Sequence, residues 1–181
     1  MPVPEITLLP SSAAEDAALV ATVTELVNSV YARAEEGLWA GPLERTTTTE
    51  VAGLVAAGEI VVARLDGRVV GCVRVRRLAD DTGEFGMLAA SAQVRGAGLG
   101  RALVRFAEER ARTAGHRRMQ LELLVPRRGT HPMKEFLAGW YQRLGYRVVR
   151  TSTLEAAFPR LAGRSAVPCE FLIYHKDLAP A

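Results

Sequence analysis

A glycine-rich segment, Arg95-Gly-Ala-Gly-Leu-Gly-Arg101, contains the residue types that point most directly to chemistry. Its glycines, Gly96, Gly98 and Gly100, carry no side chain that would hold a ligand away from the backbone. A helical pattern follows, and the free N–H groups and dipole of a helix start favour anions. Arg95 and Arg101 add charged donors suited to phosphate oxygens. The segment, with Ala97 and Leu99 completing it, therefore predicts a site for a phosphate or pyrophosphate.

The spacing of the glycines excludes two common phosphate-binding motifs. A dinucleotide fingerprint would need glycine where Arg101 stands, and it belongs to the first strand–helix unit of a parallel sheet. A P-loop would need Gly-Lys-Ser or Gly-Lys-Thr, which the sequence lacks. A glycine-rich turn without a ligand stays the alternative interpretation of the segment taken alone.

The residues around this segment show strand and helix patterns of hydrophobicity in turn. Strand patterns joined by tight turns predict an antiparallel meander over Ile60–Leu65, Val69–Val75 and Glu84–Ala90. After the glycine segment, helix and strand alternate. The further strands are expected at Ile6–Leu9, Met119–Val125, Tyr146–Thr151 and Cys169–His175. Helices are expected before the meander, over Leu99–Ala111 and from Pro132 to Leu144. This order predicts an α/β or α+β domain with a mixed sheet and helices on its faces.

Two predicted helix starts rest on capping patterns. Ser12 with Glu15, and Thr47 with Glu50, both have the spacing of a capping box. Each pair precedes apolar residues at helical spacing, so we expect a helix to begin at each of them.

The composition limits the class of protein. A chain of 181 residues with 49% apolar and 24% charged residues predicts a single globular domain over 1–181. No apolar run is long enough to span a bilayer, and the N-terminus lacks a secretory pattern, so we expect a cytoplasmic protein without a membrane partner. The two cysteines have no metal-ligand spacing, and no metal is expected. The net charge of +3 includes no long basic run, so nucleic acid is not expected as a partner.

Two motifs together resemble the GNAT superfamily of acyl-CoA-dependent N-acetyltransferases. Arg95, Gly98 and Gly100 match its Arg/Gln-x-x-Gly-x-Gly/Ala pattern, and a strand precedes them as in that superfamily. Trp140-Tyr-Gln-Arg-Leu-Gly-Tyr146 resembles its tyrosine-containing helix end. The order of the elements is also similar across nearly the whole chain. The resemblance implies the GNAT fold, in which an antiparallel meander is followed by a splayed pair of parallel strands.

The resemblance also implies a cosubstrate and its place. Acetyl-CoA would lie between Glu84–Ala90 and Met119–Val125, with its pantetheine arm paired to the backbone of Leu88, Ala89 and Ala90. A backbone N–H near Ala90 would polarise the thioester carbonyl, as oxyanion donors do. The acceptor would be a primary amine of an unidentified small molecule or peptide. Dimers are common in the superfamily, and the oligomeric state stays open.

Three side chains are candidates for catalysis. Tyr141 matches the family tyrosine that serves the departing thiolate, and its alternative is a core position in an apolar stripe. Glu84 matches the glutamate that acts as general base in histone-type members, and its alternative is a solvated carboxylate at a strand end. Glu122 is the only acid within Met119–Val125, so it could bind a cationic acceptor or share the role of base. A structural pairing of Glu122 with an arginine is the alternative.

Lys134 departs from the family, because many members carry asparagine seven residues before the tyrosine. It offers a cation to a CoA phosphate or to an acidic acceptor. Acceptor contacts in the superfamily come largely from the first two helices and their loop, which makes Glu36, Trp39, Glu44 and Arg45 candidates here. The alternative to an enzyme is a non-catalytic acyl-CoA-binding regulatory module.

Overall fold

The computed structural model describes residues 4–94, 98–161 and 163–179. Its strands form one sheet of seven in the order β1-β2-β3-β4-β5-β7-β6. The strands are β1 Glu5–Leu8, β2 Ile60–Leu65, β3 Arg68–Ala79, β4 Thr82–Ala90, β5 Arg118–Pro126, β6 Arg147–Thr153 and β7 Cys169–Asp177. The helices are α1 Ala17–Ala34, α2 Thr48–Ala56, α3 Leu99–Thr113, α4 Pro132–Arg143 and the short α5 Leu154–Ala157.

Strand pairing confirms the predicted mixed sheet. All neighbouring strands are antiparallel except β4 and β5, which run parallel. The strands β2, β3 and β4 form the expected meander. The last strand in the chain, β7, lies between β5 and β6, so β5 is paired along its whole length with a strand some fifty residues later in the sequence.

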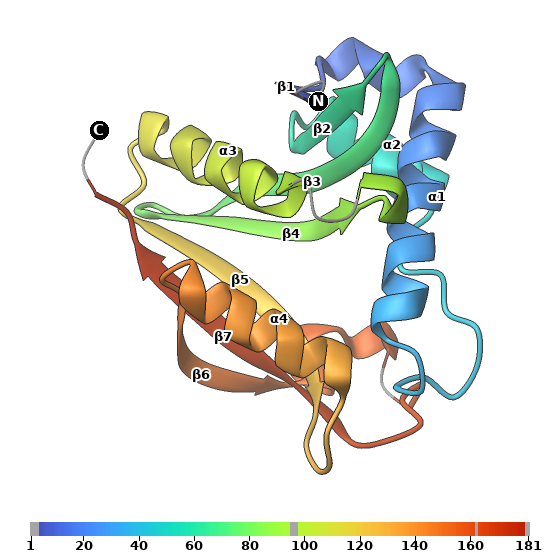
Figure 1. Cartoon of the computed structure of the whole chain (residues 1–181), viewed down its shortest axis with the longest axis vertical. Coiled ribbons are helices and arrows are strands. Elements are labelled where there is room, and N and C mark those ends of the chain that lie inside the picture. Colours follow the sequence, from blue (N-terminus) through green and yellow to red (C-terminus); the bar gives the residue numbers. More distant parts are fainter. Residues whose placement is uncertain (1–3, 95–97, 162, 180–181) are drawn as a thin grey trace.

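Helices cover both faces of the sheet (Figure 1). Val23 and Val27 of α1 and Val51 of α2 pack on Val62 and Cys72 of the meander. On the opposite face, α3 and α4 share one core cluster with the meander and with β5. That cluster includes Leu103 and Ala107 of α3, Tyr141 of α4, Phe85 of β4 and Leu121 and Leu123 of β5.

The start of α1 differs from the prediction. Ser11–Glu15 forms a separate 3₁₀ turn, and Asp16 caps α1 by accepting a hydrogen bond of 3.0 Å from the Leu19 N–H. The Ser12–Glu15 pair was therefore wrongly taken as the cap, because Asp16 offers a carboxylate directly at the helix start. The Thr47 prediction is confirmed, since its hydroxyl accepts from the Glu50 N–H at 3.1 Å.

Candidate functional site

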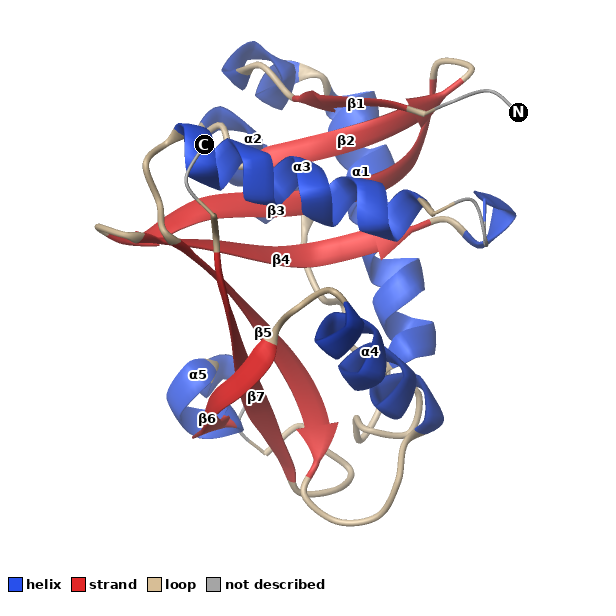
Figure 2. Ribbon diagram, turned by 60° about the vertical axis from the view of Figure 1, so that its left-hand side comes forward, coloured by secondary structure: helices blue, strands red, loops and turns tan. Residues whose placement is uncertain are grey.

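The parallel strands β4 and β5 are joined for only three residues each. Thr82–Glu84 pair with Arg118–Gln120, and beyond this point the two strands diverge, as Figure 2 shows. The other edge of β4 is paired with β3, and the other edge of β5 with β7. The facing edges of β4 after Glu84 and of β5 after Gln120 thus carry backbone groups without a strand partner in the described part of the chain. An extended ligand can pair with such an edge.

A β-bulge shapes the β4 side of this gap. Ala89 pairs with Cys72 and Gly86 with Arg74, so Met87 and Leu88 together face the single residue Val73. Met87 has a φ of +48°, which few residues other than glycine adopt. A bulge of this kind turns a backbone group out of the ladder. The amide that leaves the ladder at the bulge is that of Leu88. Ala90, near which the N–H donor was expected, is in register with Gly71; because the Ser91 N–H donates to the Val70 carbonyl oxygen, strand alternation turns the Ala90 N–H away from β3 as well.

The Leu88 amide faces the hydroxyl of Tyr31 on α1, a residue that the sequence analysis did not single out. Burial raises the pKa of Tyr31 to about 12, and the hydrogen bond from the Leu88 backbone opposes that rise. At neutral pH this phenol therefore keeps its proton. Tyr31 could have been suspected only from its helical spacing with Val27, which places it on the sheet-facing side of α1.

The start of α3 lies at the carboxyl end of β4. Of the predicted phosphate-binding segment, Arg95, Gly96 and Ala97 fall outside the described residues. Gly98 precedes the helix with a φ of +72°, a conformation that suits glycine. Leu99 is buried in the core and fixes the helix start, while Arg101 is exposed. A Cβ on Gly100 would lie 3.5 Å from the Trp140 ring, so the helix start abuts α4.

Tyr141 on α4 belongs to an aromatic cluster. Its ring centroid lies 6.2 Å from that of Phe85, 5.0 Å from Trp140 and 6.1 Å from Tyr174. Burial raises the pKa of Tyr141 above its usual range, and the neighbouring Tyr31 raises it further. The ring therefore occupies the core position of the alternative interpretation, and its hydroxyl lies within the electrostatic range of Tyr31; the role at the thiolate stays a prediction.

Glu84 is held by partners on both oxygens. Arg76 on β3 contacts Oε1 at 2.6 Å, and the Gln120 amide donates to Oε2 at 2.9 Å. The Gln120 carbonyl oxygen is 2.9 Å from His175 Nε2, so that nitrogen donates and carries the proton. The residues form one polar row across β3, β4, β5 and β7. With 13% of its side chain exposed, Glu84 is not the freely solvated carboxylate of the alternative interpretation.

Glu122 lies two residues beyond Gln120, on the same face of β5. Burial raises the pKa of Glu122, and the carboxylate of Glu84 raises it further; Arg76, Arg150 and Arg45 act in the opposite direction. Within the described ranges its carboxylate forms no ion pair or hydrogen bond. The three arginines are thus close enough to influence the charge of Glu122, but none is paired with it.

Lys134 is buried at the start of α4. Its ammonium lies 3.3 Å from Oε1 of Glu35, at the end of α1, and Trp39 Nε1 donates to the other oxygen at 2.8 Å. Only about 5% of each charged side chain is exposed. Burial lowers the pKa of Lys134. Of the residues suggested as acceptor contacts, Trp39 therefore contacts this ion pair. The carboxylate that pairs with Lys134 is that of Glu35, and not that of the candidate Glu36.

His131 caps α4 and ties it to α1. Its Nδ1 accepts from the Lys134 N–H at 3.4 Å, so Nε2 carries the proton and donates to the Glu36 carbonyl oxygen at 3.0 Å. Together with the ion pair of Lys134 and Glu35, this contact fixes the helix that carries Tyr141 against the end of α1.

Arg45, in the loop between α1 and α2, lies over two aromatic rings. Its guanidinium carbon is 5.0 Å from the ring centroid of Tyr31 and 5.6 Å from that of Phe158. Tyr31 belongs to α1 and Phe158 to the segment after β6, so Arg45 contacts rings from both of these regions.

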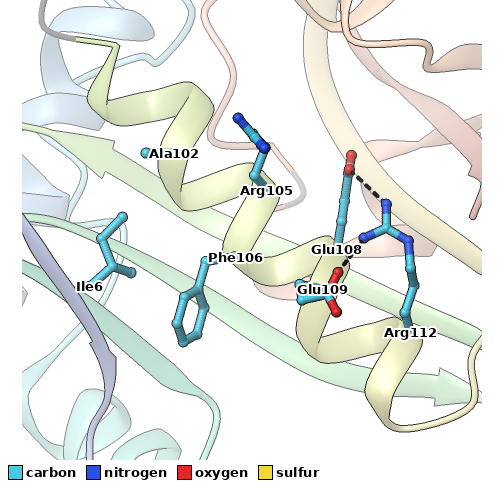
Figure 3. Close-up of a pocket in the computed structure, with 7 residues that line it drawn as sticks. All are labelled: Ile6, Ala102, Arg105, Phe106, Glu108, Glu109 and Arg112. Atoms are coloured by element: carbon cyan, nitrogen blue, oxygen red, sulfur yellow. Dashed lines mark hydrogen bonds and ion pairs between the residues drawn. The ribbon is translucent and has the colours of Figure 1, made fainter. Parts of the chain in front are cut away.

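A hollow also lies along α3, away from these residues (Figure 3). It is lined by Ile6, Ala102, Arg105, Phe106, Glu108, Glu109 and Arg112. None of the predicted site residues contributes to it. In the described residues no cluster of His, Cys, Asp and Glu could hold a metal ion, and no helix is long and apolar enough to cross a membrane.

Comparison with known proteins agrees with this architecture. The sequence profile of the acetyltransferase (GNAT) domain matches residues 56–148, just over half of the chain. No curated protein matches the chain.

Many solved structures are similar in fold. An aminoglycoside 6'-N-acetyltransferase complexed with coenzyme A is 15% identical, with a TM-score of 0.72 over 98% of each chain. The PaiA N-acetyltransferase from Thermoplasma acidophilum, also complexed with coenzyme A, is 16% identical, with a TM-score of 0.69 over 97% of this chain and 99% of that one.

The N-acetylglutamate synthase from Neisseria gonorrhoeae, complexed with coenzyme A and N-acetyl-glutamate, is 19% identical, with a TM-score of 0.65. The match covers 99% of this chain and 36% of the synthase, so the chain spans about a third of that enzyme's length. At such identities the similarity concerns the fold.

Proposed function

The chain belongs to the GNAT acetyltransferase family, and we propose that it transfers the acetyl group of acetyl-CoA to a primary amine by direct attack in a ternary complex. The observation that carries this proposal is the gap between β4 and β5, with the Leu88 amide turned into it by the bulge at Met87. Tyr31 on α1 meets that amide, and Tyr141 on α4 lies within the electrostatic range of Tyr31.

The cosubstrate would bind along the β4 side of the gap. Its pyrophosphate would meet the first N–H groups of α3, from Gly98 to Arg101, together with Arg95, Gly96 and Ala97 before them. Its pantetheine arm would pair with the open edge of Leu88–Ala90. The thioester oxygen would then accept from the Leu88 N–H, which stabilises the negative charge that develops when the amine attacks.

The proton of the acceptor ammonium needs a base, and Glu122 suits this role better than Glu84. Both oxygens of Glu84 are occupied, by Arg76 and by Gln120. Glu122 has no such partner in the described chain, and burial raises its pKa above the ordinary carboxyl value, which makes it a stronger base. In this proposal Glu84 holds Gln120 and fixes the strand junction, and its negative charge helps to raise the pKa of Glu122.

Collapse of the adduct breaks the C–S bond and needs a proton donor for the thiolate. The hydroxyl of Tyr141 has a raised pKa and is therefore protonated at neutral pH. The ammonium loses two protons as it becomes the amide. Glu122 takes the first before attack, and the second, released as the adduct collapses, restores Tyr141, whose own proton has passed to the thiolate. Lys134 was expected to contact the cosubstrate; its pairing with Glu35 supports a positioning role for α4 instead.

Release of free thiol from acetyl-CoA tests the proposal. The panel contains amino acids, aminoglycosides, polyamines and peptides, and acetyl-CoA binding is measured separately by calorimetry. Release that depends on one class of amine and falls sharply in Glu122→Gln is the expected result. Binding of acetyl-CoA without release from any amine would favour the non-catalytic binding module.

A further inference from the structure

The guanidinium of Arg45 is held in place but has no carboxylate partner. The chain has 20 Asp and Glu residues, and all of them lie in the described ranges. None forms an ion pair with Arg45, although Arg74 and Arg76 nearby are paired with Glu59 and Glu84. Arg45 is half-buried, so its unpaired donors have lost part of their contact with water.

Two aromatic rings lie close to the guanidinium that carries those donors. A guanidinium stacked over aromatic rings keeps its N–H groups free at its edge, where they can form two parallel hydrogen bonds to a carboxylate. The rings of Tyr31 and Phe158 come from opposite sides of the gap, at 5.0 and 5.6 Å. Arg45 is thus oriented before any ligand arrives.

Arg45 also lies close to the reacting groups. Its charge lowers the pKa of Tyr31, whose hydroxyl meets the Leu88 amide, and it acts in the same direction on Glu122. The gap therefore presents a carboxylate base and an unpaired guanidinium beside the place where the thioester oxygen would lie. Arg150, exposed on β6 in register with Glu122 through Ile173, adds a second positive charge.

We propose that Arg45 binds a carboxylate of the acceptor, so that the acceptor is an amino acid or a close derivative carrying both an amine and a carboxylate. This rests on the proposed acetyl transfer. The ammonium of such a molecule faces Glu122 and its carboxylate faces Arg45, so each of its charges meets one of opposite sign. A polyamine or an aminoglycoside would instead bring a further ammonium against Arg45 and Arg150, and like charges brought together disfavour binding.

The test compares matched acceptors in the same thiol-release assay. Each amino acid is measured beside its carboxamide and beside the amine that lacks the carboxylate. We expect the wild-type kcat/KM to favour the acid by about 10- to 100-fold, the usual effect of hydrogen bonds to a charged group. In Arg45→Gln we expect that preference to vanish, because KM should rise far more for the acid than for the two analogues that lack the carboxylate.

Two controls keep the result interpretable. Arg105→Gln removes an exposed arginine of α3 outside the gap and should leave the preference intact. Arg45→Lys keeps the positive charge but not the two parallel N–H donors of the guanidinium, and it should retain part of the preference for the acid. The ratio of acid to amine is measured within one preparation, so partial unfolding of a variant does not change it.

The outcomes separate the two proposals. Transfer to amines with no preference for the acid, or a preference that survives in Arg45→Gln, would overturn the assignment of Arg45 and leave acetyl transfer standing. Bound acetyl-CoA without transfer to any acid, amide or amine would overturn the proposed function and this inference with it.

Discussion

Two carboxylates, Glu35 and Glu122, differ in whether other side chains pair with them. At the junction of α1 and α4, Glu35 and Lys134 are buried together, and Trp39 occupies the remaining oxygen of Glu35. On the polar face of β5, Glu122 is only half-buried, yet it has no ion pair or hydrogen bond in the described chain. The pairing of Glu35 with Lys134 maintains the junction of the two helices, whereas the lack of a partner at Glu122 is consistent with the role of base that we propose for it.

The largest effect should follow from Glu122→Gln, which removes the proposed base without changing its shape. We expect kcat/KM to fall by about a hundred- to ten-thousand-fold, the usual contribution of a positioned base. The binding constant for acetyl-CoA should stay nearly unchanged, because Glu122 lies on the acceptor side. If Glu84→Gln reduces turnover more than Glu122→Gln, the roles assigned to the two carboxylates are reversed.

The second effect concerns stability. Lys134→Met leaves the Glu35 carboxylate buried without its cation, which typically costs about 3–5 kcal/mol of unfolding free energy. Denaturant unfolding measures this loss. The double variant Lys134→Met/Glu35→Gln should recover a large part of it, because the uncharged amide can still accept from Trp39.

A titration of acetyl-CoA into Lys134→Met addresses the original expectation for this residue. If the Lys134 ammonium pairs only with Glu35, the folded fraction of Lys134→Met should bind acetyl-CoA with the affinity of the wild type. A marked loss of affinity would show that Lys134 contacts the cosubstrate after all.

Tyr141→Phe should have a smaller effect than loss of the base. The ring stays in its aromatic cluster, so the unfolding free energy should change little, while turnover falls about ten- to a thousand-fold. Unchanged turnover would remove Tyr141 from the mechanism and leave it as a core residue. Tyr31→Phe is the matched variant, because it removes the neighbouring hydroxyl that meets the Leu88 amide.

The smallest expected effects concern how kcat/KM and the unfolding temperature depend on pH through Glu122. Because burial raises its pKa in the folded protein, the acid limb of kcat/KM should lie above the ordinary carboxyl value of 4.5 and vanish in Glu122→Gln. The same shift means that the folded protein binds this proton more tightly than the unfolded chain. Ionised Glu122 therefore destabilises the fold, and Glu122→Gln should unfold at a slightly higher temperature at pH 7 but not below the ordinary pKa.

Much of the fold could be predicted because its elements carry local signals. The strands of the meander, the helix that follows the glycine segment and the helix start at Thr47 are all readable from neighbouring residues, and the structure confirms each of them. The cap of α1 was wrong because two acceptors, Ser12 and Asp16, compete within five residues. Sequence alone does not indicate which of them the chain uses.

The site was harder to predict because its geometry depends on distant contacts. Lys134 meets Glu35 across 99 residues of sequence, and no local pattern links them. The bulge at Met87 also gives no signal, because methionine is an unusual residue at a positive φ. The resemblance suggested Glu84 as the base and its place in Met119–Val125 suggested Glu122, and the sequence left the choice open; the hydrogen bonds of Glu84 now distinguish the two.

The place of β7 in the sheet has a consequence for biosynthesis. β1 to β4, with α1 and α2, can assemble a core of their own while the chain is still emerging from the ribosome. The strand that carries Glu122 has no antiparallel neighbour until Cys169–Asp177 has been synthesised. A nascent chain that already contains Arg95–Arg101 would therefore still lack β7, the strand that holds β5 and Glu122 in the sheet. The order of synthesis would then delay acetyl transfer until nearly the whole of this sequence is available.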